Sequence, residues 1–103
     1  MGAYYRRILD HALGALLSVQ FTTQGNDVID YAVVLLLDSK KGTETIRVYD
    51  GAHGHNEMHR YTRSGGKELG AAFHGGTLGE GVRAAITEVE RGYREMIEGW
   101  ERQ

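Results

Sequence analysis

The sequence predicts an α+β domain: an antiparallel sheet of four to five strands, connected as a meander, packs against a long C-terminal helix, with a short N-terminal helix. Three observations support this prediction. Segments with strand-like alternation follow one another between residues 16 and 74, short glycine-containing turns separate them, and the C-terminal part repeats its apolar residues every three to four positions. The 103 residues correspond to one domain, 1-103.

The N-terminal segment, residues 4–13, is predicted to form the short helix. Gly14 follows it and is a plausible stop. A helix this short needs packing against the rest of the chain. Its apolar residues fall at helical spacing: Ile8, Leu9, Ala12 and Leu13.

Five strands are predicted after this helix. The second of them contains the run Tyr31 to Leu37, which has no polar face. Such a strand is typically covered on both sides. We therefore expect a second apolar layer, supplied by the first helix or by a second copy of the chain. The predicted strands are Leu16–Thr23, Val28–Asp38, Thr43–Asp50, Glu57–Arg63 and a short edge strand, Glu68–His74.

The C-terminal helix is the most clearly marked element. One apolar stripe extends from Leu78 to Trp100 at steps of three and four residues. Thr77 and Glu80 have the spacing of a capping box at its start. On its outer face, the spacing of Glu90 with Arg94, and of Glu98 with Arg102, predicts ion pairs.

Composition narrows the functional classes. A net charge of −2 is not typical of proteins that bind nucleic acid or membrane surfaces non-specifically. The chain has no cysteine, so it has neither disulfides nor thiolate metal sites. The N-terminus lacks the pattern of a signal peptide, and the longest apolar run is too short to cross a bilayer. We expect a cytoplasmic protein without a membrane partner.

The stretch from Asp50 to Tyr61 is the richest in groups that titrate or bind. It holds three of the five histidines, and the alternation of the predicted strand places Glu57, His59, Tyr61 and Arg63 on one face. By the same alternation, Arg60 lies on the opposite face. The candidate catalytic residues are Asp50, His53, His55, His59, Arg60 and Tyr61.

These residue types suit acid–base cleavage of RNA without a metal. One imidazole takes the proton from a ribose 2′-hydroxyl, a second protonates the leaving oxygen, and a guanidinium stabilises the charge on the phosphorane. In this interpretation we expect no cofactor and no resident metal. The expected partners are an RNA substrate, a cognate protein and a second copy of the chain.

The segment Val48 to Gly54, followed by His59, Arg60 and Tyr61 and then by a terminal amphipathic helix, resembles a group of short, mostly uncharacterised bacterial proteins. That group carries a Tyr-Asp-x-x-His-Gly segment with a downstream His-Arg. It is similar in layout to the TumE-type toxins of toxin–antitoxin systems. The resemblance implies a small intracellular α/β domain acting on RNA. The matching positions are Tyr49, Asp50, His53, Gly54, His59 and Arg60.

Three other interpretations stay open. The chain can be a non-enzymatic, homodimeric protein-binding module in which the histidine loop contacts a partner. It can be a metal protein in which His53, His55 and His59 ligate zinc or nickel. Finally, the histidines can simply form turn hydrogen bonds or face solvent.

Overall fold

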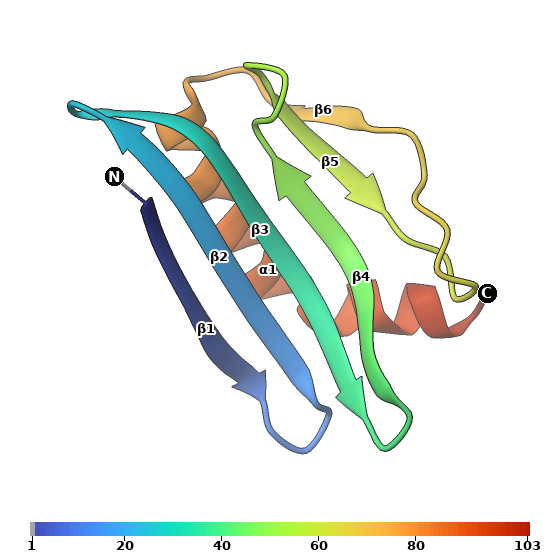
Figure 1. Cartoon of the computed structure of the whole chain (residues 1–103). Helices are drawn as coiled ribbons and strands as arrows, with labels where there is room; N and C mark the ends of the chain where they lie inside the picture. Colours follow the sequence, from blue (N-terminus) through green and yellow to red (C-terminus); the bar gives the residue numbers. More distant parts are fainter. Residues whose placement is uncertain (1) are drawn as a thin grey trace.

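The fold is a six-stranded antiparallel sheet with one long helix on one of its faces (Figure 1). A computed structural model describes residues 2–103. The strands follow chain order across the sheet, so the predicted meander is confirmed, but with six strands in place of four to five. The elements are β1 Gly2–Asp10, β2 Ala15–Gln24, β3 Asp27–Ser39, β4 Gly42–Asp50, β5 Asn56–Arg60, β6 Ala71–His74 and α1 Leu78–Glu101.

The predicted N-terminal helix is wrong, because these residues form strand β1 along the edge of β2. Alternate residues of β1 point to opposite faces of the sheet. Arg7 contacts Glu90 of the helix and Leu9 packs against the core, whereas Ile8 is exposed on the other face. Pairing with a long neighbouring strand supplies backbone hydrogen bonds along the whole segment. A short isolated helix could not match this gain.

The three central strands agree with the sequence to within one residue at each end. The later strands differ more: β5 begins at Asn56 and ends at Arg60, and β6 is limited to the four residues Ala71–His74. Between them, a single bridge joins Tyr61 to Lys67. The alternation that the sequence suggests from residue 57 to residue 63 therefore stops three residues early.

Helix α1 covers β2, β3 and β4 and encloses the hydrophobic core. The capping box of Thr77 and Glu80 is confirmed. Glu90 and Arg94 pair with Arg7 and with Asp10 across the helix–sheet interface, in place of the ion pair predicted between them. In the part of the chain that the structure describes, no helix is both long enough and apolar enough to cross a membrane.

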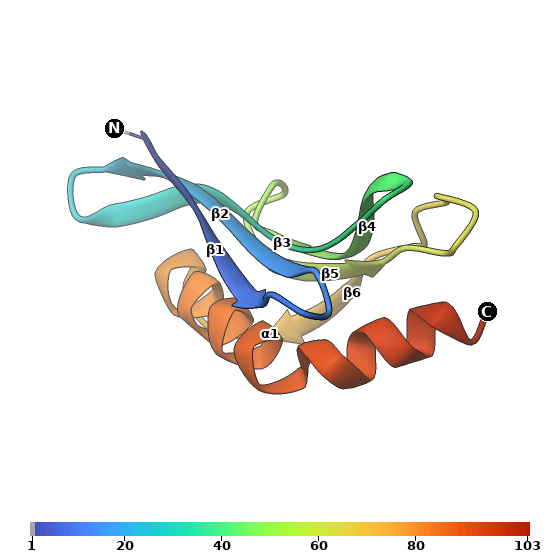
Figure 2. The ribbon, with the colours of Figure 1, turned by 90° about the horizontal axis from the view of Figure 1, so that it is seen from below.

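The opposite face of the sheet is open (Figure 2). The second apolar layer expected over β3 is not supplied by the N-terminal segment, since that segment lies in the sheet itself. Val34 is partly exposed on this face and Leu36 is only 8% exposed, sheltered by its neighbours in the sheet. We call this surface the open face and the other the helix face.

Candidate histidine and carboxylate site

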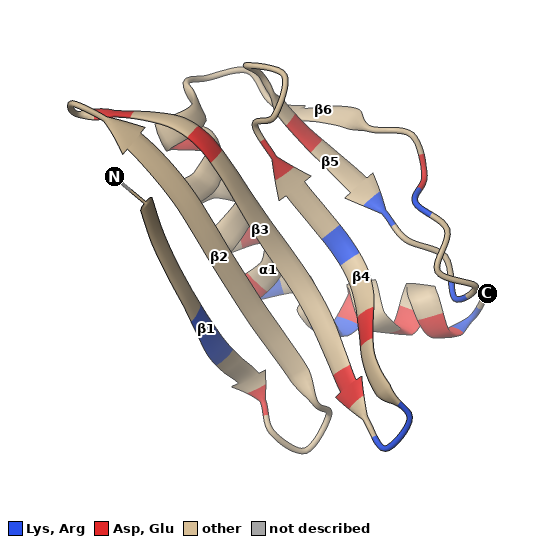
Figure 3. Ribbon diagram, viewed as in Figure 1, with Lys and Arg blue, Asp and Glu red and all other residues tan. Residues whose placement is uncertain are grey.

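Three ionisable side chains meet on the open face, where β4 ends and β5 begins. Asp50 lies directly opposite Glu57, and Val48 lies opposite His59. Directly opposed residues project to the same face of a sheet, so Asp50, Glu57 and His59 converge. Figure 3 shows acidic positions on the adjoining ends of these strands. We call these three residues the central cluster.

The central cluster is compact and mostly shielded from solvent. The Nε2 atom of His59 lies 3.5 Å from Oδ2 of Asp50 and 3.5 Å from Oε2 of Glu57. The exposed fractions of the side chains are 12% for His59, 15% for Asp50 and 18% for Glu57. These groups are therefore reachable from solvent, but they are not freely hydrated.

A backbone contact sets the orientation of the His59 ring. The Nδ1 atom lies 3.1 Å from the carbonyl oxygen of Glu68. A carbonyl can only accept, so Nδ1 carries the hydrogen and donates it. In neutral His59, Nε2 is then the unprotonated nitrogen, and its lone pair is on the side of the two carboxylates.

The segment that supplies this carbonyl passes close to the central cluster at Gly70. A Cβ atom at residue 70 would lie 2.6 Å from Oε2 of Glu57 and 2.6 Å from Cε1 of His59. Any side chain there would displace one of the two groups. Gly70 therefore permits the approach of backbone that closes one side of the site.

Two further histidines lie in the loop before β5. The Nε2 atom of His55 is 2.5 Å from Oε1 of Glu57, the carboxylate oxygen that does not face His59. Its side chain is 64% exposed. The ring of His53 lies 6.3 Å from that of His55, centroid to centroid. The loop thus places two imidazoles at the solvent side of the central cluster.

Buried Asn56 anchors this loop to the rest of the fold. Tyr31 donates its hydroxyl hydrogen to Oδ1 of Asn56 at 2.7 Å. The Asn56 amide donates to the carbonyls of Gly76 and Thr77, at 3.0 and 3.2 Å, just before the helix begins. Burial and, secondly, the nearby Asp50 carboxylate raise the pKa of Tyr31, so its hydroxyl stays a donor. The contacts of Asn56 therefore hold the backbone in place between His55 and Glu57.

Arg60 and Tyr61 lie away from the central cluster. Arg60 lies opposite Arg47 in the pairing of β4 with β5. Both project to the helix face, as the alternation from His59 requires. Tyr61 was expected on the face of His59, but it lines a recess beside Trp100 at the end of the helix. Arg63, expected there too, stacks its guanidinium 5.4 Å from the Trp100 ring. The cause is the early end of β5, after which strand alternation no longer applies.

The structure thus brings together Asp50, His59 and His55, with His53 nearby, and separates them from Arg60 and Tyr61. Glu57 joins the site, although it was not among the candidate catalytic residues. Its position on the His59 face was a usable signal. The Glu68 carbonyl and Gly70 had no such signal, because backbone contacts between distant segments leave no pattern in a sequence.

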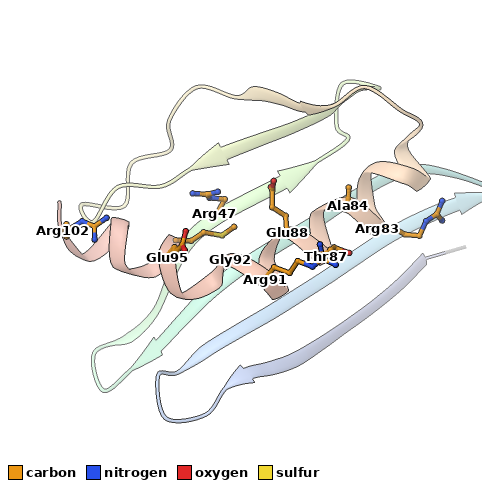
Figure 4. Close-up of a pocket in the computed structure, with 10 residues that line it drawn as sticks. Arg47, Arg83, Ala84, Thr87, Glu88, Arg91, Gly92, Glu95 and Arg102 are labelled. Carbon is orange, nitrogen blue, oxygen red and sulfur yellow. The ribbon is translucent and has the colours of Figure 1, made fainter.

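A second concavity lies on the helix face, between α1 and β4 (Figure 4). It has a volume of about 900 Å³, and arginine and glutamate side chains dominate its polar lining. Arg47 extends into it from the sheet and Glu88 from the helix. Tyr49 is buried close by, and burial is the main cause that raises its pKa to about 12. Among residues 2–103, no histidine lines this groove, so the central cluster remains the better candidate for chemistry.

Comparison of the chain with protein-family models, with curated proteins and with solved structures gave no match. Any functional assignment therefore rests on the geometry of the central cluster.

Proposed function

We propose that the protein is a small ribonuclease-like enzyme whose reaction takes place at the central cluster and the adjacent loop histidines. The observation that carries the proposal is the contact between His55 and Glu57, beside the carboxylate–histidine group of Asp50 and His59. An exposed imidazole paired with a carboxylate is suited to accepting a proton from a substrate. The resemblance to TumE-type toxins supports RNA as the substrate class.

The proton transfers can be assigned to the two loop histidines. His55 takes the proton from a ribose 2′-hydroxyl, and Glu57 stabilises the imidazolium that results. The 2′-oxygen then bonds to the adjacent phosphorus while the bond to the 5′-oxygen breaks. His53, protonated and nearby, gives its proton to that leaving oxygen. The products are a 2′,3′-cyclic phosphate and a free 5′-hydroxyl, and each proton is accounted for.

The charge of the site restricts this reaction. Asp50 and Glu57 both oppose an approaching phosphate, and Arg60, which was expected to stabilise the phosphorane, projects to the helix face. A positive charge at the central cluster would remove this repulsion. The acidic net charge of the whole chain points the same way, since it gives no general attraction for RNA.

Cleavage of a short fluorescent single-stranded RNA tests the proposal. His55→Ala is expected to lower the cleavage rate by about 100-fold, the usual contribution of one acid–base group. His11→Ala is the matched control, because His11 is an exposed histidine in the β1–β2 turn. A 2′-deoxy substrate should not be cleaved. Equal rates for wild type and His55→Ala, or no cleavage by either, would reject the proposal.

A second candidate function is a homodimeric binding module, and the open face favours it. Ile8 is 59% exposed there, and Leu16, Val34 and Val48 are partly exposed on the same face. Within residues 2–103, no element covers these side chains. Sedimentation equilibrium tests this function: a dimer that Val34→Lys converts to a monomer would support it, and a monomeric wild type would exclude it.

A further inference from the structure

We propose that Asp50, Glu57 and His59 bind one divalent transition-metal ion, of the Zn²⁺ or Mn²⁺ type. The use of this ion in RNA cleavage rests on the proposed function, but its binding does not. The ion would be held by one atom from each residue: Oδ2 of Asp50, Oε2 of Glu57 and Nε2 of His59. One ligand atom from each of the three residues lies within 4.8 Å of the other two.

The first argument is distance. Two ligands that are each about 2.1 Å from a tetrahedral zinc ion lie about 3.4 Å from each other. The Nε2 atom of His59 lies 3.5 Å from each of the two carboxylate oxygens. A charge-assisted hydrogen bond between such groups would be shorter, at about 2.7–2.9 Å. The separations therefore suit ligands that share a metal better than an imidazolium bonded to two carboxylates.

The second argument is the orientation of His59. A metal-ligating histidine generally donates its other ring N–H to a carbonyl or a carboxylate. His59 donates Nδ1–H to the Glu68 carbonyl at 3.1 Å, from outside the three proposed ligands. The remaining nitrogen then offers a lone pair to the same space as the two carboxylate oxygens. Three electron-pair donors face this space, and a cation satisfies all of them at once.

The third argument is charge. Asp50 and Glu57 are directly opposite each other on adjacent strands, and each is less than one-fifth exposed. Like charges in that position destabilise a sheet. The two carboxylates bring negative charge to one place, and a divalent ion compensates this charge. It also removes the repulsion that a phosphate would otherwise meet.

The ligand set decides the class of ion. Imidazole nitrogen favours zinc, nickel and copper, whereas carboxylate oxygens alone favour calcium and magnesium. A mixed set of one nitrogen and two oxygens suits zinc or manganese. Three protein ligands leave at least one position for water or a substrate oxygen, as in catalytic zinc sites. His55 contacts the other carboxylate oxygen of Glu57, beside the proposed ligands.

The test is calorimetric titration of the chelator-treated full chain with ZnCl₂ and, separately, with MnCl₂. We expect one site per chain. Asp50→Asn, Glu57→Gln and His59→Gln should each weaken binding of the tighter-bound ion by at least about 10-fold. His11→Ala and Asp30→Asn are the matched controls and should bind as wild type does, and His53→Ala reports on the exposed loop. Far-UV circular dichroism confirms that each variant is folded.

Absence of saturable binding by wild type would overturn the inference. So would unchanged affinity in the three ligand variants, or a loss confined to His53→Ala, which would place the ion in the exposed loop.

The RNA assay separates this inference from the proposed function. One-site binding without RNA cleavage by the loaded protein would reject the ribonuclease and leave the metal site standing. Cleavage that persists in EDTA, together with no metal binding, would reject the metal site and leave the ribonuclease standing.

Discussion

The two faces of the sheet differ in composition and in their contribution to stability. The helix face carries the fully buried side chains, including Leu35 and Val33 of β3 and Tyr49 of β4, under a single helix. In the described part of the chain, no helix covers the open face, and charged groups gather on it where β4 ends and β5 begins. Apolar burial stabilises the first face, whereas the second sets like charges close together.

Strand β5 shows how closely these two roles are joined. Asn56 and Met58 project to the helix face, where Asn56 is 1% exposed and Met58 packs against the core. Glu57 and His59 alternate with them and project to the site. The same few residues thus anchor the fold and present the reactive groups, and Asn56 is the residue that links the site to the helix face.

The largest effect is expected from the core. Leu35→Ala removes a fully buried side chain and leaves a cavity under α1, so it should lower the free energy of unfolding by about 2–5 kcal/mol. Urea denaturation followed by circular dichroism measures the change. The fraction that remains folded should bind Zn²⁺ with unchanged affinity. Weakened binding by the folded fraction would show that the two faces are not separable.

A smaller loss is expected from the residue that links the two faces. Asn56→Ala removes the acceptor of the Tyr31 hydroxyl and the amide that donates to the Gly76 and Thr77 carbonyls, which should cost about 1–3 kcal/mol. It should also loosen the loop that holds His55. Both the free energy of unfolding and the metal affinity should therefore fall, whereas Leu35→Ala should lower only the free energy of unfolding. A variant that loses stability but keeps full affinity would argue against this link.

The open face predicts an effect of opposite sign. Asp50→Asn removes one of two opposed carboxylates, so the metal-free protein should become more stable by about 0.2–1 kcal/mol. The same change should weaken binding of the ion. The two effects together would show that Asp50 serves binding at the expense of stability. Thermal unfolding in EDTA measures the first effect. A destabilised Asp50→Asn variant would show that the carboxylates do not repel each other.

The smallest effect concerns Asp10 at the edge of the helix face. The Leu13 backbone N–H, with lesser contributions from Arg94 and Tyr93, lowers the pKa of this carboxyl below its ordinary value. A lowered folded-state pKa contributes stability above the unfolded-state pKa, and that stability is lost as the pH falls through the folded-state value. Asp10→Asn should therefore have a lower free energy of unfolding than wild type at neutral pH, and this difference should shrink in acid. Urea denaturation at pH 7 and pH 2.5 measures the difference, and the same value at both pH values would contradict the prediction.

The sequence predicted the parts of the fold that strong local patterns determine. The apolar run of β3 and the stripe of α1 each indicate one structure, and both were found. The apolar residues of the N-terminal segment have helical spacing, but the segment pairs with the free edge of β2 as a strand. Propensity cannot foresee such a choice, because it depends on a partner distant in the sequence.

The candidate site was predicted only in part, again because local patterns are visible in the sequence and contacts between distant segments are not. Alternation along β5 correctly placed Glu57 beside His59 and Arg60 behind them. The expected position of Tyr61 failed where the strand ended. The carbonyl of Glu68 and the close approach at Gly70 depend on a crossing of backbone segments, which only the folded chain displays.

The most direct test of the account is ¹⁵N NMR of the histidine side chains during titration with Zn²⁺. We expect His59 to carry its hydrogen on Nδ1 in the metal-free protein at neutral pH, as its contact with the Glu68 carbonyl requires. One equivalent of Zn²⁺ should then shift the Nε2 resonance of His59 and leave that of His11 unchanged. A His59 that carries hydrogen on Nε2, or whose Nε2 resonance does not respond to Zn²⁺, would contradict the central claim.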